Sequence, residues 1–267
     1  MNLRERFDLV ILDWAGTMVD FGCQAPVRAL LEAFAAEGVV IDVASARRDM
    51  GKSKADHVRA LLQIPVVAAA WSAARGRPAN DSDVELLMGR LGPLMREHAA
   101  AAATLIPGAK DTVERLRALG FKIASSTGYT REMMAPVLAR AAAEGYVPDH
   151  VVCAGETPVG RPTPLMIYKA CAELGVWPLS RVIKVDDAEA GMAEGKSAGA
   201  FTVGIATGNT VGLTLEEWRA LGTRERTAHL EASERVLRAA GADLVIESIA
   251  DLIPALSSIG QKTPAAL

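Results

Sequence analysis

Short apolar runs alternate along the chain with longer stretches in which apolar and polar residues recur at helical spacing. Six of these runs are candidates for buried strands: 7–14, 121–127, 150–155, 181–187, 201–207 and 242–248. Helix-like stretches separate them, including 109–120, 130–145 and 164–175, and several stop at a glycine, as helices often do. Because the runs are almost continuously apolar, we expect strands that are covered on both faces. The alternation predicts an α/β fold with a doubly wound parallel sheet.

The residues from about 22 to 104 break this alternation. They contain alanine- and leucine-rich stretches typical of helices, such as VRALLQ and VVAAAWSAARG. No run among them is typical of a strand. We therefore predict an all-helical insertion after the first strand, from which the chain returns at the IPG turn, 106–108. The predicted division is a core of 1–21 and 105–267 and a helical domain of 22–104.

Composition and charge narrow the class of protein. Half of the residues are hydrophobic and 23% are charged, which is ordinary for a folded globular chain. The formal net charge of -3 gives no electrostatic reason to expect nucleic acid or an acidic membrane as a partner. No long uncharged apolar run suggests a signal peptide or a membrane span, so we expect a cytoplasmic location. Cys23, Cys153 and Cys171 lack metal-type spacing, which argues against a zinc site or a disulfide framework.

Polar residues gather at the ends of the predicted strands. Asp13 ends the first run, the turn 125–128 (SSTG) ends the second, and Asp186 and Asp187 end the fourth, while Arg161 lies between the third and fourth. A lone aspartate after a strand is more often a turn or helix cap. Parallel sheets, however, place their ligands beyond the carboxyl ends of the strands, so these groups are expected to meet. The set suits a phosphate site, with carboxylates as nucleophile or metal ligands.

Two sets of motifs resemble known families. In order, LVILDWAGT, SSTGYTREMM, GRPTP and IKVDDAEAG resemble the four motifs of the haloacid dehalogenase superfamily, whose members form an aspartyl-enzyme intermediate with magnesium. DWAGT, MGKSKADH, TGYTREMM and GNTVGLTLEEW together are similar to the phosphonoacetaldehyde hydrolase (phosphonatase) family along essentially the whole chain. The resemblance implies a Rossmann-like core, a helical cap inserted after the first strand, and a homodimer. It also implies hydrolysis of phosphonoacetaldehyde, a small phosphonate, to acetaldehyde and phosphate.

The residue two positions after Asp13 bears on which bond is broken. Most phosphatases of the superfamily carry a second aspartate there to protonate an alkoxide leaving group, whereas this chain has Ala15. When a carbon–phosphorus bond breaks, its electrons leave onto carbon, so an electron sink is needed. A lysine that condenses with the neighbouring aldehyde supplies one, because a protonated imine accepts the electrons.

Two other functions stay open at this stage. One is a phosphatase or phosphomutase of the haloacid dehalogenase type that acts on a small phosphate ester, and Ala15 argues against it. The other is a non-catalytic phosphate-binding module. The intact set of Asp13, Lys54, Arg161 and Asp187 argues against that.

The stretch MGKSKADH, 50–57, holds the candidate amine. If 52–63 is helical, Lys54 and His57 lie at i, i+3 on one face while Lys52 points elsewhere. A lysine and a histidine on a helix are more often a solvated surface, but the other motifs and Ala15 favour a site. The resemblance assigns Lys54 as the imine-forming residue and His57 as its proton-transfer partner. The pKa of lysine is ordinarily about 10.4. Lys54 must therefore be desolvated or lie beside positive charge to offer a free amine near neutral pH.

The resemblance also assigns the remaining site residues. The protein ligands of Mg²⁺ are the Asp13 side chain, the Ala15 carbonyl and Asp187, with Asp186 as the alternative because a one-residue shift in the DD pair exchanges the two. The other substrate-binding positions are Met50, Gly51, Thr127, Gly128, Arg161 and Cys23. Gly191 stands where superfamily members often carry an acid.

Overall fold

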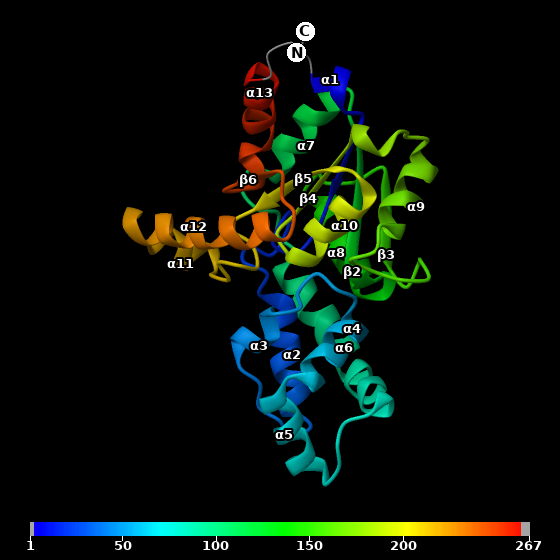
Figure 1. Ribbon diagram of the computed structural model, residues 1–267, viewed down its shortest axis with the longest axis vertical. Helices are drawn as coiled ribbons and strands as arrows, with labels where there is room; N and C mark the ends of the chain where they lie inside the picture. Colours follow the sequence, from blue (N-terminus) through cyan, green and yellow to red (C-terminus); the bar gives the residue numbers. More distant parts are fainter. Residues whose placement is uncertain (1–2, 263–267) are drawn as a thin grey trace.

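Six strands form one parallel sheet in the order β3-β2-β1-β4-β5-β6 in the computed structural model, which describes residues 3–262 (Figure 1). Each strand falls in one of the six predicted runs, and β2 alone continues beyond its run, by three residues: β1 Leu9–Leu12, β2 Lys122–Thr130, β3 His150–Ala154, β4 Val182–Asp186, β5 Phe201–Ile205 and β6 Leu244–Ile246. All five strand pairs are parallel. The strand order is that of a Rossmann-like doubly wound sheet, so the predicted fold class is confirmed.

Alternate residues of the central strand pack on opposite layers of helices. Leu9 and Ile11 belong to a core cluster formed with α9 (Leu165–Leu174). Val10 and Leu12 belong to the main cluster, which includes α7 (Ala109–Ala118), α8 (Arg131–Ala143) and α13 (Leu252–Lys262). The sheet is therefore buried on both faces, which explains why its strands read as continuous apolar runs. The remaining helices of this part are α1 (Leu3–Arg6), α10 (Glu189–Ala198), α11 (Leu215–Ala220) and α12 (Thr223–Ala239).

Five helices form the insertion between β1 and β2: α2 Ala25–Ala35, α3 Val43–Arg47, α4 Lys54–Gln63, α5 Pro65–Arg75 and α6 Asp81–Ala102. They gather at one end of the sheet (Figure 1). The long helices α2 and α6 pack together through buried side chains, among them Leu30, Phe34, Leu87 and Leu91. The all-helical cap after the first strand is thus confirmed, while its division from the core at 22 and 104 stays a prediction.

The helix that carries the candidate lysine begins two residues later than predicted. Ser53 is its N-cap, with the side-chain hydroxyl accepting a hydrogen bond from the Asp56 N–H at 3.2 Å. Gly51 has φ +88°, a left-handed conformation that favours glycine, so 51–53 is a turn. Lys54 is consequently the first residue of α4, where the positive end of the helix dipole disfavours a second positive charge.

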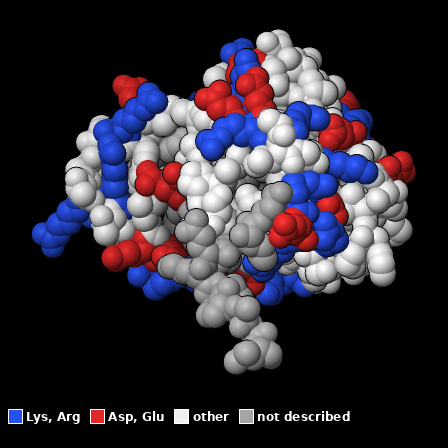
Figure 2. All heavy atoms as spheres, turned by 90° about the horizontal axis from the view of Figure 1, so that it is seen from above, with Lys and Arg blue, Asp and Glu red and all other residues white. Residues whose placement is uncertain are grey.

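The surface carries charges of both signs. On the face shown in Figure 2, Lys and Arg side chains lie among Asp and Glu side chains. Among the residues that the structure describes, no helix is both long and apolar enough to cross a bilayer.

Candidate active site

A small cavity lies where the carboxyl ends of β1, β2 and β4 meet the turn before α4. Its volume is about 20 Å³, enough for the centre of about one water molecule. Its wall consists of Asp13, Ala15, Cys23, Met50, Gly51, Lys54, Thr127, Gly128, Tyr129, Arg161, Asp187 and Ala188. Of the predicted site residues, only His57 and Asp186 are not among these. Strand ends from the core and a turn from the cap therefore build one site.

Asp13 is held at the end of β1 by the neighbouring strand and by Arg161. The Asp13 N–H donates to the Val185 carbonyl at 3.0 Å, and one carboxylate oxygen accepts a hydrogen bond from Arg161 Nη2 at 2.8 Å. Burial and the charge of Asp186 raise the pKa of Asp13 to about 6, although Arg161 opposes this. The carboxylate is fixed in position yet poorly compensated in charge.

Asp187 reaches the same cavity between two glycines. A Cβ atom on Gly16 would lie 1.9 Å from an Asp187 oxygen, and one on Gly208 would lie 2.2 Å from the Asp187 Cβ. The carboxylate accepts a hydrogen bond from the Asn209 N–H at 2.6 Å. Burial, followed by the charges of Asp13 and Asp186, raises the pKa of Asp187 well above its usual value.

Asp13, Asp186 and Asp187 bring oxygens within 4.8 Å of one another. Three buried carboxylates at such spacing repel one another, and for two of them the pKa is raised. A divalent cation among them would favour their ionised forms, and oxygen donors of this kind suit a hard cation. The residues therefore fit a metal site.

Asp186 differs from its neighbour because two buried cations contact it. Lys184 Nζ lies 2.9 Å and Arg161 Nη2 3.2 Å from the same Asp186 oxygen. Burial raises the pKa of Asp186, but the two cations outweigh it and hold the pKa below the usual value. Asp186 is already paired inside the protein, whereas Asp187 faces the cavity.

Sequence reasoning missed part of this charge network. Glu194 on α10 accepts from Arg161 Nε at 2.9 Å, and its side chain lies 3.4 Å from Lys184 Nζ. Lys184 also donates to the Ser126 hydroxyl at 2.9 Å. A lysine inside an apolar strand, RVIKVDD, was the available signal, because a charge buried there requires partners.

Gly191 explains how Asp186 fits beneath α10. A Cβ at this position would lie 2.0 Å from the Asp186 Cγ, so any larger residue would displace the carboxylate. The helix instead presents an acid one turn later, at Glu194. Gly191 therefore makes room for Asp186, and Glu194 is the acid that α10 contributes to the charge network.

Lys54 comes from the cap, and its side chain is only 2% exposed. Its Nζ lies 3.8 Å from the Met50 sulfur and 5.2 Å from the centre of the Tyr129 ring. No carboxylate of the described residues lies within ion-pair distance of it. Burial lowers the pKa of Lys54 to about 8, and the positive charge of Arg161 adds a smaller decrease. An appreciable fraction of free amine is therefore present near neutral pH.

His57 and Tyr129 are buried polar groups beside this lysine. Neither the His57 ring nitrogens nor the Tyr129 hydroxyl has a hydrogen-bond partner within the described residues. Burial, then the charge of Lys54, lowers the pKa of His57 to about 3, so its ring is neutral at physiological pH. Tyr129 follows Gly128 in the TGYTREMM motif, but its place in the wall depends on the fold and was not predicted.

The cap and core backbones touch at the edge of the cavity. A Cβ on Gly128 would lie 2.4 Å from the Lys52 carbonyl oxygen and 2.9 Å from that of Gly51. Gly128 therefore has no room for a side chain in this arrangement. Lys52 lies in the turn before α4 rather than on another face of the helix; its side chain pairs with Asp49 and does not line the cavity.

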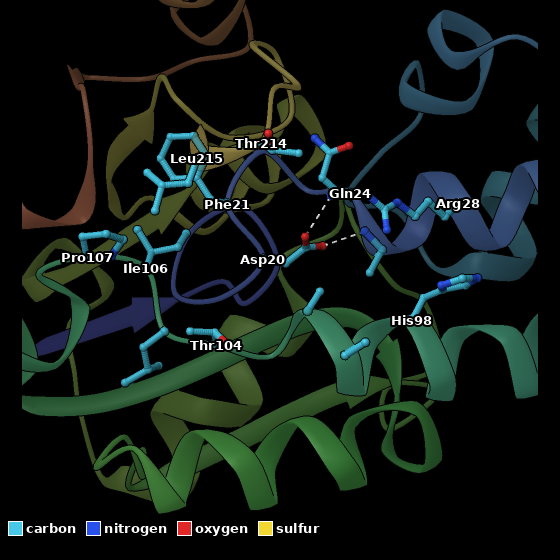
Figure 3. Close-up of a pocket in the computed structure, with 14 residues that line it drawn as sticks. Asp20, Phe21, Gln24, Arg28, His98, Thr104, Ile106, Pro107, Thr214 and Leu215 are labelled. Atoms are coloured by element: carbon cyan, nitrogen blue, oxygen red, sulfur yellow. Dashed lines mark hydrogen bonds between the residues drawn. The ribbon is translucent and has the colours of Figure 1, made fainter. Parts of the chain in front are cut away.

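A larger cavity, about 330 Å³, lies at the junction of cap and core (Figure 3). Its wall includes Phe21 and Gln24 after β1 and the return segment 104–107. The Asp20 carboxylate accepts hydrogen bonds from the Gln24 N–H at 3.0 Å and the Ala25 N–H at 2.9 Å (Figure 3). None of the predicted site residues lines this cavity, so the candidate chemistry belongs to the smaller one.

Comparisons with known proteins extend over both the core and the cap. A family profile described as haloacid dehalogenase-like hydrolase matches residues 7–199. The chain is 43% identical over 251 residues to a phosphonoacetaldehyde hydrolase of Paraburkholderia phytofirmans, with 94% of each chain covered. It is 45% identical over 241 residues to one of Syntrophobacter fumaroxidans, with 90% of this chain and 87% of the relative covered. The crystal structure of a phosphonoacetaldehyde hydrolase-like protein from Oleispira antarctica matches with a TM-score of 0.94 at 40% identity, covering 96% of this chain and 94% of that one.

Proposed function

This chain belongs to the haloacid dehalogenase-like hydrolases and, within them, to the phosphonoacetaldehyde hydrolases, and from this premise we propose how it cleaves a carbon–phosphorus bond. The proposed reaction converts phosphonoacetaldehyde and water to acetaldehyde and phosphate. The observation that carries the mechanism is a buried lysine that has no carboxylate partner among the described residues and lies in the same cavity wall as the carboxylate of Asp13. The first group acts on the aldehyde and the second on phosphorus.

The first step is condensation of Lys54 with the aldehyde. The free amine adds to the carbonyl carbon, and uptake of one proton expels the oxygen as water, which leaves an imine that is protonated on nitrogen. The lowered pKa of Lys54 supports this role, because the amine must be unprotonated to attack. Burial also keeps competing water away from the imine.

The second step breaks the carbon–phosphorus bond. Asp13 attacks phosphorus, and the bonding electrons move to the carbon and onward to the imine nitrogen, so the leaving group is an enamine. Arg161 and the backbone of Thr127 and Gly128 hold the phosphonate oxygens in this scheme. The planar guanidinium suits two-point contact with such oxygens, and its link to Asp13 at 2.8 Å aligns the nucleophile.

Water then hydrolyses the aspartyl phosphate to release phosphate and the Asp13 carboxylate. Protonation of the enamine carbon and hydrolysis of the imine release acetaldehyde and restore the Lys54 amine. His57 is proposed as the proton-transfer partner on the cap side. Its buried ring nitrogens have no other hydrogen-bond partner among the described residues, which leaves them available for this role.

We assign the metal as Mg²⁺, held by the Asp13 side chain, the Ala15 carbonyl and Asp187. When bound, it offsets the negative charge between the attacking carboxylate and the phosphonate. Asp187 is preferred over Asp186 as the direct ligand because Asp186 is already paired with Lys184 and Arg161. Ala15 leaves no acid positioned to protonate an ester oxygen.

The test is a comparison of substrates. The purified protein is incubated with phosphonoacetaldehyde and, separately, with small phosphate esters, with and without Mg²⁺, and both acetaldehyde and phosphate are measured. We expect equal amounts of acetaldehyde and phosphate from the phosphonate, dependent on Mg²⁺, and at most slow release from esters. Faster phosphate release from an ester would instead support the phosphatase alternative.

Three further proposals concern location, assembly and the cap. We propose that the chain acts in the cytoplasm. From the family resemblance we propose that it forms a homodimer, which sedimentation at several protein concentrations will test. We also propose that the cap of 22–104 opens to admit substrate. A cavity of about 20 Å³ supports this, because a phosphonoacetaldehyde molecule is much larger than the one water it accommodates.

A further inference from the structure

One arginine of the cap is bonded to neutral oxygens from two separate core and hinge segments. Arg47, the last residue of α3, donates from Nη1 to the Gly22 carbonyl at 2.9 Å and the Cys23 carbonyl at 3.3 Å. Nη2 donates to the Gly212 carbonyl at 3.0 Å, and Nη1 also reaches the carbonyl and side-chain oxygens of Asn209 at 3.4 and 3.3 Å. No carboxylate of the described residues pairs with this guanidinium. All of these hydrogen bonds go to the segment 22–23, the hinge where the predicted cap begins, and to the loop 208–212.

The loop is shaped to receive this side chain. Gly212 has φ +66°, and a Cβ there would lie 2.7 Å from Arg47 Nε, so a side chain would displace the guanidinium. Asn209 returns a hydrogen bond, from Nδ2 to the Arg47 carbonyl at 3.3 Å. Gln24 of the hinge also donates to the Gly212 carbonyl, at 2.8 Å. The loop is thus held by the cap and the hinge together.

The other side of the same loop contacts the cation site. The Asn209 N–H donates to an Asp187 oxygen at 2.6 Å, and Gly208 lies against the Asp187 side chain so closely that a Cβ would clash. Asp187 has no cationic partner among the described residues, and the Thr17 hydroxyl donates to it only at 3.4 Å, so the shorter bond from Asn209 is a main restraint on its orientation. A displacement of Asn209 would therefore weaken its hydrogen bond to Asp187 and change the orientation of that carboxylate.

We propose that Arg47 is a positioning residue that latches the closed cap onto the loop 208–212 and so fixes Asp187 for the metal. It touches neither the cavity nor the reacting atoms. When the cap opens, the contacts to Asn209 and Gly212 break, and the loop loses the partner that keeps the Asn209 N–H on Asp187. Closure of the cap and completion of the cation site become one event. The inference rests on the proposed role of Asp187 as a metal ligand.

The test uses Arg47→Gln with the adjacent Arg48→Gln as control. Arg48 is exposed, and its guanidinium makes no hydrogen bond or ion pair in the described part of the chain, so its substitution removes the same charge from the same segment. Two quantities are measured without substrate: Mg²⁺ affinity by calorimetry, and the rate of limited proteolysis at 20–24 and 104–108. We expect Arg47→Gln to bind Mg²⁺ about tenfold more weakly, as loss of groups that orient metal ligands commonly does, and to be cleaved several times faster. Arg48→Gln should match the wild type in both.

A second variant protects the test against misfolding. Asn209→Ala removes the side-chain contacts to Arg47 but keeps the backbone N–H that donates to Asp187. It should reproduce both effects in weaker form, and the double variant with Arg47→Gln should be no worse than Arg47→Gln alone. Wild-type Mg²⁺ affinity and cleavage rates in folded Arg47→Gln and Asn209→Ala would overturn the latch. Additive losses in the double variant would also overturn it, since they would show independent effects. Neither readout involves substrate, so both judge the latch even if the substrate comparison fails.

Discussion

The two halves of the cavity handle buried charge in opposite ways. On the core side, Arg161 and Lys184 are fully buried and meet the carboxylates of Asp13, Asp186 and Glu194 at 2.8 to 3.4 Å. On the cap side, Lys54 is equally buried, but its amine contacts a methionine sulfur and lies over a tyrosine ring. In the first environment the two cations hold the pKa of Asp186 below its usual value, although burial still raises that of Asp13. The second lowers a pKa by withholding partners.

The difference matches the chemistry that each half has to perform. An attacking carboxylate and a phosphonate clamp need fixed charges in fixed places, which a network of ion pairs supplies. An amine that adds to an aldehyde needs to lose its charge, so pairing with a carboxylate would be harmful. Had Lys54 been given a partner like that of Lys184, its pKa would rise and the free amine would become scarce.

Removal of the nucleophile on the core side should have the largest effect. Asp13→Asn keeps the shape and the Arg161 contact region but removes the nucleophilic charge, so turnover should fall by at least about 10³-fold. Phosphate release and thermal unfolding are measured together. Near-normal release by a folded Asp13→Asn protein would eliminate the aspartyl phosphate.

The next largest effect is expected where the backbones of the cap and the core touch, and it is a fall in kcat/KM. In Gly128→Ala the new methyl group would lie 2.4 Å from the Lys52 carbonyl, so the cap cannot close as far. Misplacement of the lysine by about 1 Å should reduce kcat/KM by about 10²-fold. The control is Gly89→Ala, because an added Cβ at Gly89 would have no atom within 4 Å of it. Equal kcat/KM in both variants would contradict contact-limited closure.

The cap half should be more stable without its lysine. The pKa of Lys54 falls from 10.5 to about 8 on folding, and each pKa unit corresponds to about 1.36 kcal/mol, so the charge costs about 3 kcal/mol at pH 7. This cost is complete below pH 8 and disappears as the pH rises from 8 to 10.5. Lys54→Met should therefore unfold at higher denaturant concentration than the wild type at pH 7, with the gain vanishing near pH 10.5.

Lys52→Met is the matched control for that stability measurement. Its side chain is partly exposed and its charge pairs with Asp49 on the surface, so the change in unfolding free energy should stay within about 0.5 kcal/mol. If Lys54→Met were no more stable than Lys52→Met, burial of the Lys54 charge would not destabilise the folded protein, and the contrast between the two sides of the cavity would fail.

The smallest expected effect is the change of kcat/KM with pH. kcat/KM reports the free enzyme, so it should rise about tenfold per pH unit up to the Lys54 pKa of about 8 and then level off. Below about 6 the slope should steepen, because Asp13, with its raised pKa, also protonates. Rates are corrected for ionisation of the phosphonate itself. A profile flat from pH 6 to 8 would exclude a protonated resting lysine.

Much of the fold and most of the cavity wall were predictable from local sequence. Buried parallel strands leave continuous apolar runs, and motifs at their ends reach one edge, which is why Asp13, Thr127 and Asp187 came together as expected. The strand ends depend on periodicity and on residues close in the chain. The place of Lys54 was predicted from the family resemblance instead, and its helix begins at 54 because Ser53 caps it.

Features that depend on distant packing could not be predicted. Glu194 and Lys184 became neighbours only through the approach of α10 to β4, and Gly191 and Gly195 permit it. Tyr129 lines the cavity because the cap lysine lies over its ring. His57 and Asp186 were predicted in the site but lie outside the cavity wall, since wall membership depends on side-chain direction within the closed protein.

Chemical trapping tests the central claim that the cap lysine forms an imine. Borohydride added during turnover reduces an imine to a stable secondary amine, and peptide mass spectrometry then locates the two-carbon fragment. We predict the adduct on Lys54, its loss together with activity in Lys54→Arg, and its persistence in Lys52→Arg, because an always-protonated guanidinium cannot add to the aldehyde. Labelling at Lys52 with Lys54 unmodified, or full turnover with no lysine trapped, would contradict the account.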